Sequence, residues 1–109
     1  MKDICIALVE DLKAHRLEVL AMDNRIAELN KSKALLVAKF QSQINGNKDY
    51  KNADQRKAAL ATVTSIDDEY LQIEKELAEL GNRKALELID QQYCSELLRV
   101  NLAFAGHSV

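Results

Sequence analysis

The absence of proline is the feature that most constrains this sequence. Its 109 residues include no proline and only three glycines, so very little along the chain would interrupt a helix. About half of the residues, 54 of 109, are Ala, Glu, Lys, Leu or Arg, which is typical of long helices and coiled coils. This composition excludes collagen-like, disulfide-scaffold and Pro/Gly-rich disordered chains. We therefore expect an all-α protein that forms a single helical domain over residues 1–109.

The first third of the chain carries a regular apolar stripe. Ten positions follow alternating steps of four and three residues, and eight of them are apolar. This spacing predicts one long helix, over about residues 4–44, with a coiled-coil-like seam. Gly46 is expected to end this helix in the left-handed conformation. The stripe consists of Leu8, Leu12, His15, Val19, Met22, Ile26, Leu29, Lys33, Leu36 and Phe40.

A polar connector, residues 45–52, is followed by a predicted short helix over about residues 53–63. Asn52 with Gln55 three residues later resembles a capping box and predicts where this helix begins. A threonine- and serine-rich stretch is expected to end it. The interrupting residues are Thr62, Thr64 and Ser65.

A third helix is predicted over about residues 67–103, with Ser65 and Asp68 as a second capping box. Its apolar stripe begins in heptad phase with Ile66, Tyr70, Ile73, Leu77 and Leu80. The apolar pattern then drifts to Ala85, Ile89, Tyr93 and Leu97, at steps of four. Gly81 lies where the drift begins. It permits a local bend or a close backbone approach, or it occupies an ordinary surface position.

Two long helices joined by a short one favour an antiparallel helical hairpin. A chain reversal centred near Arg56 would set its register. The two polar residues of the first stripe, His15 and Lys33, would then meet Glu96 and Glu79 as partners that fix the register. The remaining predicted ion pairs are Arg16–Glu96, Arg25–Glu87, Lys84–Glu28 and Arg99–Asp11.

The sequence lacks the residue constellations of an enzyme. It contains two histidines, neither preceded by a glutamate in Glu-x-x-His spacing, and no phosphate-binding glycine loop or nucleophile elbow. We therefore expect no catalytic residues, no cofactor and no metal. Two cysteines without Cys-x-x-Cys spacing favour a reducing cytoplasmic location, and no apolar stretch is long enough for a signal peptide or a membrane span.

Charge is unevenly distributed along the chain. Residues 31–57 carry seven basic and two acidic side chains, whereas residues 58–109 carry four basic and nine acidic ones. In a hairpin the first of these segments is the closed end, which we name the basic tip. It either contacts an anion or nucleic acid or is a solvated connector whose charge balances the acidic last helix. The candidate contact residues are Lys48, Lys51, Asn52, Arg56 and Lys57.

The open end of the predicted hairpin is apolar on several sides. A helix that is apolar over more than one face requires more than one neighbour. We therefore expect self-association, most simply a homodimer that forms a four-helix bundle. The predicted self-association residues are Ile4, Ile6, Val9, Leu98, Leu102 and Phe104, and further apolar residues off the seam are Leu17, Leu20, Leu35 and Val37.

The segment from Tyr50 to Leu60, followed by Asp67-Asp68-Glu69-Tyr70-Leu71, resembles small helical proteins of phage and prophage origin. The resemblance covers about residues 48–104 and consists of an Asn-Ala-x-x-Arg turn before a long helix. Some such proteins are associated with DNA recombination or replication, so the resemblance implies a nucleic-acid role for Asn52 and Arg56. Taken together, the sequence favours a non-enzymatic structural or adaptor protein with an unknown protein partner. The alternative is an accessory protein of nucleic-acid metabolism that uses the basic tip.

Overall fold

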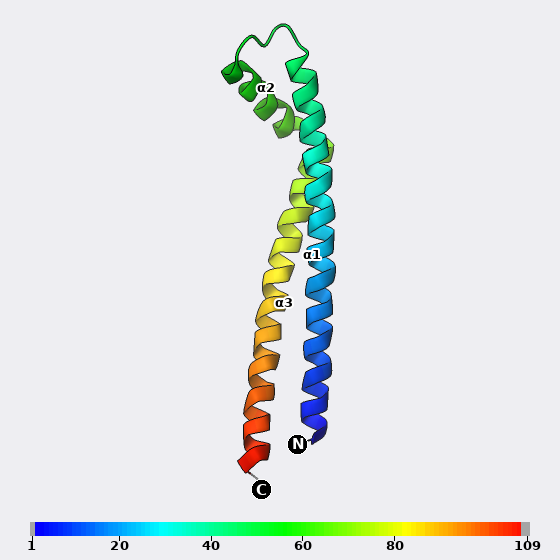
Figure 1. Cartoon of the computed structure of the whole chain (residues 1–109), viewed down its shortest axis with the longest axis vertical. Helices are drawn as coiled ribbons and strands as arrows, with labels where there is room; N and C mark the ends of the chain where they lie inside the picture. Colours follow the sequence, from blue (N-terminus) through cyan, green and yellow to red (C-terminus); the bar gives the residue numbers. More distant parts are fainter. Residues whose placement is uncertain (1, 108–109) are drawn as a thin grey trace. The chain divides into compact units, whose positions relative to one another are not determined.

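The protein is helical almost throughout. A computed structural model describes residues 2–107, which form three helices: α1 (Lys2–Asn45), α2 (Ala53–Ile66) and α3 (Asp68–His107) (Figure 1). The all-α class and the three-helix order are thus confirmed. Within the described residues, no helix combines the length and the apolar character needed to cross a membrane.

The start of α2 uses the capping residues that the sequence indicates. The Asn52 side chain accepts a hydrogen bond from the Gln55 backbone N–H at 2.9 Å, and the Gln55 side chain accepts one from the Lys51 N–H at 2.6 Å. These two bonds satisfy amide groups that have no partner within the helix. The predicted capping role of Asn52 is confirmed.

The end of α2 differs from the prediction. The helix continues through the threonine- and serine-rich stretch to Ile66. The Thr62, Thr64 and Ser65 hydroxyls donate to carbonyls three or four residues earlier within the helix instead of ending it. The second capping box is also wrong. Asp67 separates the helices: its N–H donates to the Val63 carbonyl at 3.0 Å, and its carboxylate accepts from the Tyr70 N–H at 2.9 Å.

The end of α1 does not need a left-handed glycine. No described residue, glycine included, has a positive φ angle, so the conformation expected for Gly46 is wrong. Its N–H donates to the Ser42 carbonyl at 3.1 Å, and the next N–H, of Asn47, donates to Ile44 at 3.1 Å. The helix therefore ends in a tightened last turn.

Gly81 occupies an ordinary surface position. It is exposed within the uninterrupted helix α3, and a Cβ atom added there would have no neighbour within 4 Å. The alternative of a close backbone approach at this glycine is wrong.

The chain divides into two compact units that share the long helices. Unit 1 comprises Met1–Asn24 and Leu80–Val109, and unit 2 comprises Arg25–Glu79. In each unit a segment of α1 lies against a segment of α3, and in unit 2 α2 lies beside the last turns of α1 (Figure 1).

The predicted stripe of α1 is its shielded face. All ten positions are buried or half-buried, including the two polar ones. The least exposed side chains are Met22 in unit 1 and Leu29 in unit 2, at 5% each. The heptad spacing of α1 thus identified its inner face correctly.

The inner face of α3 differs from the prediction beyond Leu80. The heptad phase does not drift, because the shielded positions continue with Lys84, Glu87, Gln91 and Cys94. The expected stripe residues Ile89 and Tyr93 are instead 63% and 62% exposed, and Ala85 is exposed as well. Three successive inner positions of α3 in unit 1, between Leu80 and Cys94, are therefore polar, and large apolar residues beside them lie outside.

The predicted register is wrong by one to three helical turns. Arg25 pairs with Glu76 instead of Glu87, and Lys33 pairs with Glu74 instead of Glu79. Lys84 likewise pairs with Asp23 at 2.6 Å. The reversal occupies residues 46–52, before Arg56, and α2 already returns along α1. Partners of α1 therefore come earlier in the returning chain than a reversal at Arg56 implies.

We expect Leu29→Ala to lower the free energy of unfolding by about 2–3 kcal/mol, because it leaves a cavity in the core of unit 2. Leu35→Ala, at a position that is 64% exposed in the same unit, is the matched control and should change stability by less than about 0.5 kcal/mol. Urea unfolding followed by circular dichroism measures both. Equal effects would contradict the described core.

Candidate functional site

The seam of unit 1 contains a histidine–carboxylate pair. His15 Nδ1 on α1 lies 2.7 Å from Glu87 Oε2 on α3, and both side chains are about one quarter exposed. The hydrogen bond to Glu87 raises the pKa of His15 above its ordinary value, Asp90 and Asp11 add attraction, and desolvation opposes them. The prediction that a carboxylate satisfies His15 is confirmed, but the carboxylate is Glu87 instead of Glu96.

Asp90 completes a three-residue group around this pair. One potential ligand atom from each of His15, Glu87 and Asp90 lies within 4.8 Å of the others. One nitrogen and two oxygen donors can coordinate a divalent cation. However, Asp90 is exposed, and the hydrogen bond and charge of Glu87 already account for the position of His15. We therefore interpret the group as an ion-pair network of the seam.

The seam of unit 2 contains a second polar cluster. Lys33 forms an ion pair with Glu74, and its ammonium lies 5.6 Å from the centre of the Tyr70 ring. The hydrogen bond from Lys33 lowers the pKa of Glu74 and, reciprocally, raises that of Lys33. Arg25 makes two hydrogen bonds to Glu76, at 2.9 and 3.2 Å. Each polar position in the α1 seam thus has a carboxylate partner on α3.

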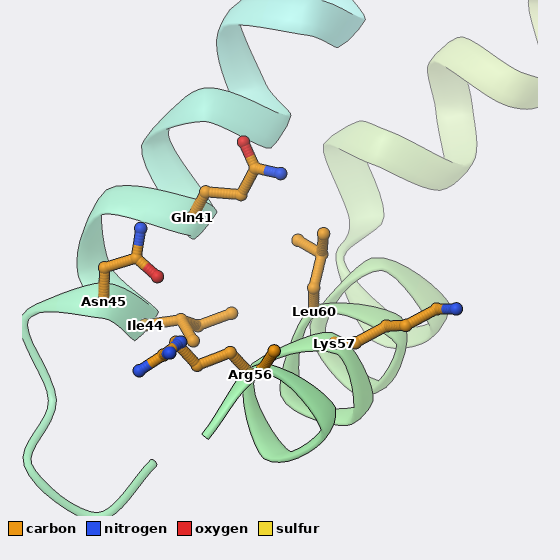
Figure 2. Close-up of a pocket in the computed structure, with 7 residues that line it drawn as sticks. Gln41, Ile44, Asn45, Arg56, Lys57 and Leu60 are labelled. Carbon is orange, nitrogen blue, oxygen red and sulfur yellow. The ribbon is translucent and has the colours of Figure 1, made fainter. Parts of the chain in front are cut away.

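The basic tip contains a shallow cavity of about 420 Å³ between the end of α1 and α2. Arg56 and Lys57 contribute cations to its lining, but Figure 2 shows the Arg56 side chain turned toward Ile44 and Asn45 and the Lys57 ammonium turned away from them. Arg56 also donates to the Tyr50 carbonyl at 3.4 Å. The two cations therefore do not converge on a common anion position.

The other predicted contact residues of the basic tip are dispersed. Lys48 and Lys51 are exposed and do not line this cavity. The Asn52 side chain is occupied by its capping bond to Gln55. The structure thus brings together only Arg56 and Lys57 of the five candidate residues.

The predicted self-association residues lie closer together than the candidate residues of the basic tip do. An open apolar groove of about 390 Å³ lies in unit 1, between the first turns of α1 and the last turns of α3. Four of the six predicted residues line it, and Ile4 and Phe104 are exposed outside that lining. The lining residues are Cys5, Ile6, Val9, Glu10, Leu98 and Leu102.

The groove continues along α1 as a face that sequence reasoning identified only in part. Seven residues at helical spacing are exposed there, and we name this face the outer stripe of α1. The sequence predicts self-association through Ile6 and Val9 and places Leu17 and Leu20 off the seam. It gives no role to Glu10 or Lys13 and pairs Arg16 with Glu96. The outer stripe consists of Ile6, Val9, Glu10, Lys13, Arg16, Leu17 and Leu20.

The charges of this stripe have no partner within the described chain. Glu10, Lys13 and Arg16 are exposed and form no ion pair with any described residue. In contrast, the seam charges His15, Asp23 and Lys84 of the same unit are paired. The outer stripe therefore combines apolar surface with charges that are available to another molecule.

Comparisons of the chain with protein-family models, with curated proteins and with solved structures gave no match.

We expect the His15–Glu87 pair to make stability dependent on pH. Because the folded pKa of His15 is raised, the pair contributes fully below the unfolded pKa of histidine, about 6.5. This contribution is lost as the pH rises through the higher folded pKa. Midpoints of thermal unfolding measured between about pH 5 and about pH 8, where histidine titrates, should therefore converge for wild type and His15→Gln as the pH rises. A constant difference would contradict the role of the pair.

Proposed function

We propose that this protein is a non-enzymatic structural or adaptor protein that acts through helix–helix association with a second copy of itself. In this proposal α1 and α3 form an antiparallel hairpin, and two hairpins combine as a homodimeric four-helix bundle in the cytoplasm. The observation that carries the proposal is the exposed apolar surface of unit 1, formed by the groove and the outer stripe of α1.

The shallow core supports this proposal. No described side chain is less than 2% exposed, although fully buried residues are usual in the core of a domain. A seam between two helices covers only one face of each, and the remaining apolar faces stay in water. A second layer of helices would cover them and convert the seam into an interior.

The exposed apolar residues of both helices of unit 1 also fit a dimer. Ile6, Val9, Leu17 and Leu20 of α1 and Leu88 and Leu102 of α3 are among those that are about half exposed. Contiguous apolar patches of several hundred Å² on a protein commonly mark interaction sites.

The polar groups of the protein fit a structural role. Four basic side chains pair with carboxylates across the two long helices: His15, Arg25, Lys33 and Lys84. Both cysteines are free thiols, which suits a reducing compartment. The paired side chains have a structural role, because they fix how α1 and α3 align within each unit.

Sedimentation equilibrium tests the self-association. We expect the wild-type chain to be dimeric at micromolar concentration, and the double variant Ile6→Glu with Leu102→Glu to shift toward monomer because it places charge in the groove. Leu35→Glu, at an exposed position of unit 2, is the matched control and should leave association unchanged. A monomeric wild-type protein would overturn the proposal.

The basic tip supports a second candidate function, contact with nucleic acid. Its lysines Lys48, Lys51 and Lys57 are exposed and form no ion pair with any residue of the described range. Lysine–phosphate contacts release counterions, so affinity would fall steeply with salt. We place this candidate second because the cations of the tip cavity diverge (Figure 2).

Fluorescence anisotropy with labelled DNA tests this second function. If the tip binds phosphates, Lys51→Gln with Lys57→Gln should lower the slope of log affinity against log salt by about two. Lys75→Gln with Arg83→Gln removes the same charge outside the basic tip and should leave that slope unchanged. Absence of binding at low salt, or equal effects of the two pairs, would exclude the basic tip as a nucleic-acid site.

A further inference from the structure

The outer stripe of α1 has a nearly palindromic pattern centred on Lys13. Apolar residues stand seven positions from Lys13 on both sides, Ile6 and Leu20, and again four positions away, Val9 and Leu17. Three positions away stand opposite charges, Glu10 and Arg16. All seven residues are exposed on one face of a continuous helix in unit 1.

A twofold contact between identical helices requires this kind of pattern. In such a contact residue i of one copy meets residue j of the other, and j meets i in return. An antiparallel pair of helices has its twofold axis at the central residue, so residues at equal distances on either side of it fall in the same layer. Apolar residues then meet apolar residues, and opposite charges meet if they flank the centre.

We propose that a second copy of this chain docks antiparallel on the outer stripe of α1, with the twofold axis at Lys13. This inference rests on the proposed function and specifies its interface. Ile6 of one copy meets Leu20 of the other, and the layer of Val9 and Glu10 meets the layer of Leu17 and Arg16. Each contact occurs twice because of the symmetry.

The charges select the antiparallel orientation over a parallel one. A parallel twofold pair in the same register would place Glu10 beside Glu10 and Arg16 beside Arg16, which is repulsive. The antiparallel pair places Glu10 beside Arg16 of the second copy on both sides of the axis. Both side chains are exposed and without an ion pair in the described chain, so docking breaks no existing pair.

Lys13 at the axis opposes docking to some extent because it meets its own copy. Its long side chain can extend to the rim and keep its ammonium hydrated. The Glu10 carboxylates lie one turn away in the same chain and about one turn away in the second copy, so they offset part of the repulsion. This arrangement favours a reversible dimer over a permanent one, and it predicts that Lys13→Leu tightens association.

The groove extends the same surface toward the ends of the chain. It adjoins the outer stripe at Ile6, Val9 and Glu10 and adds Leu98 and Leu102 of α3. The apolar residues nearest Leu20 of the second copy therefore include side chains of both helices of unit 1. The docking surface is a two-helix face, as a four-helix bundle requires.

A charge swap tests the proposed register. We expect Glu10→Arg and Arg16→Glu singly to raise the dissociation constant roughly tenfold, which corresponds to about 1.4 kcal/mol. The double variant reverses both charges and should return to within about twofold of wild type. Sedimentation equilibrium measures association, and thermal unfolding by circular dichroism checks that each variant folds. Single variants that associate like wild type, or a double variant that is no better than the singles, would overturn the register.

Cysteine cross-linking tests the axis independently. Helices packed about 8–10 Å apart bring facing Cα atoms, each about 2.3 Å from its helix axis, within the span of a disulfide. Lys13→Cys in a Cys5→Ser and Cys94→Ala background should therefore give a covalent dimer under oxidised glutathione, which accepts the two electrons. Glu18→Cys, exposed but outside the outer stripe, is the matched control and should remain uncross-linked.

The outcomes separate this inference from the proposed function. A wild-type dimer that neither responds to the charge changes nor cross-links at position 13 would refute the outer-stripe interface and leave self-association intact. A monomeric wild-type protein would refute both. Cross-linking at position 18 with none at position 13 would place the contact on a different face of α1.

Discussion

The pairing of α1 with α3 depends on polar side chains placed inside an otherwise apolar seam. His15 and Lys33 occupy stripe positions on α1, and Glu87 and Lys84 occupy shielded positions on α3. A polar group in such a position needs a partner, because its desolvation is otherwise uncompensated. The pairs therefore contribute less to stability than to register, since a shift by one turn would leave several of them unpaired at once.

The sequence was sufficient to predict the helices and the inner face of α1, because there apolar character and burial coincide. In α3 they do not coincide. Ile89 and Tyr93 are exposed, while Glu87 and Gln91 are shielded, so a pattern of hydrophobicity alone follows the wrong face. The register error has a different origin, because the chain reverses at residues 46–52, before Arg56, and the partners on α3 come correspondingly earlier. The end of α2 is also missed, because three hydroxyl side chains that predict a helix end bond to preceding carbonyls within the helix.

The sequence predicts that the protein has more apolar residues than one helix pair can bury, but it does not show which of them form one surface. The count of exposed apolar side chains pointed to association, and the groove now joins four of the expected residues. The near-symmetry about Lys13 is a property of the sequence, but it indicates an interface only together with the helix pairs, which show which charges already have partners. His15 pairs with Glu87 and therefore belongs to the seam. Arg16 has no ion-pair partner among the described residues and therefore belongs to the outer stripe.

Asp67 separates α2 from α3. One residue in extended conformation, with φ −76° and ψ 119°, ends α2 and caps α3. No glycine or proline enforces the break there, so the separation depends on capping chemistry instead of backbone restriction. A side chain without an acceptor at this position would leave the extended conformation uncompensated, and the adjoining helices could merge into one rod. The separation of α2 from α3 therefore depends on a single carboxylate, that of Asp67.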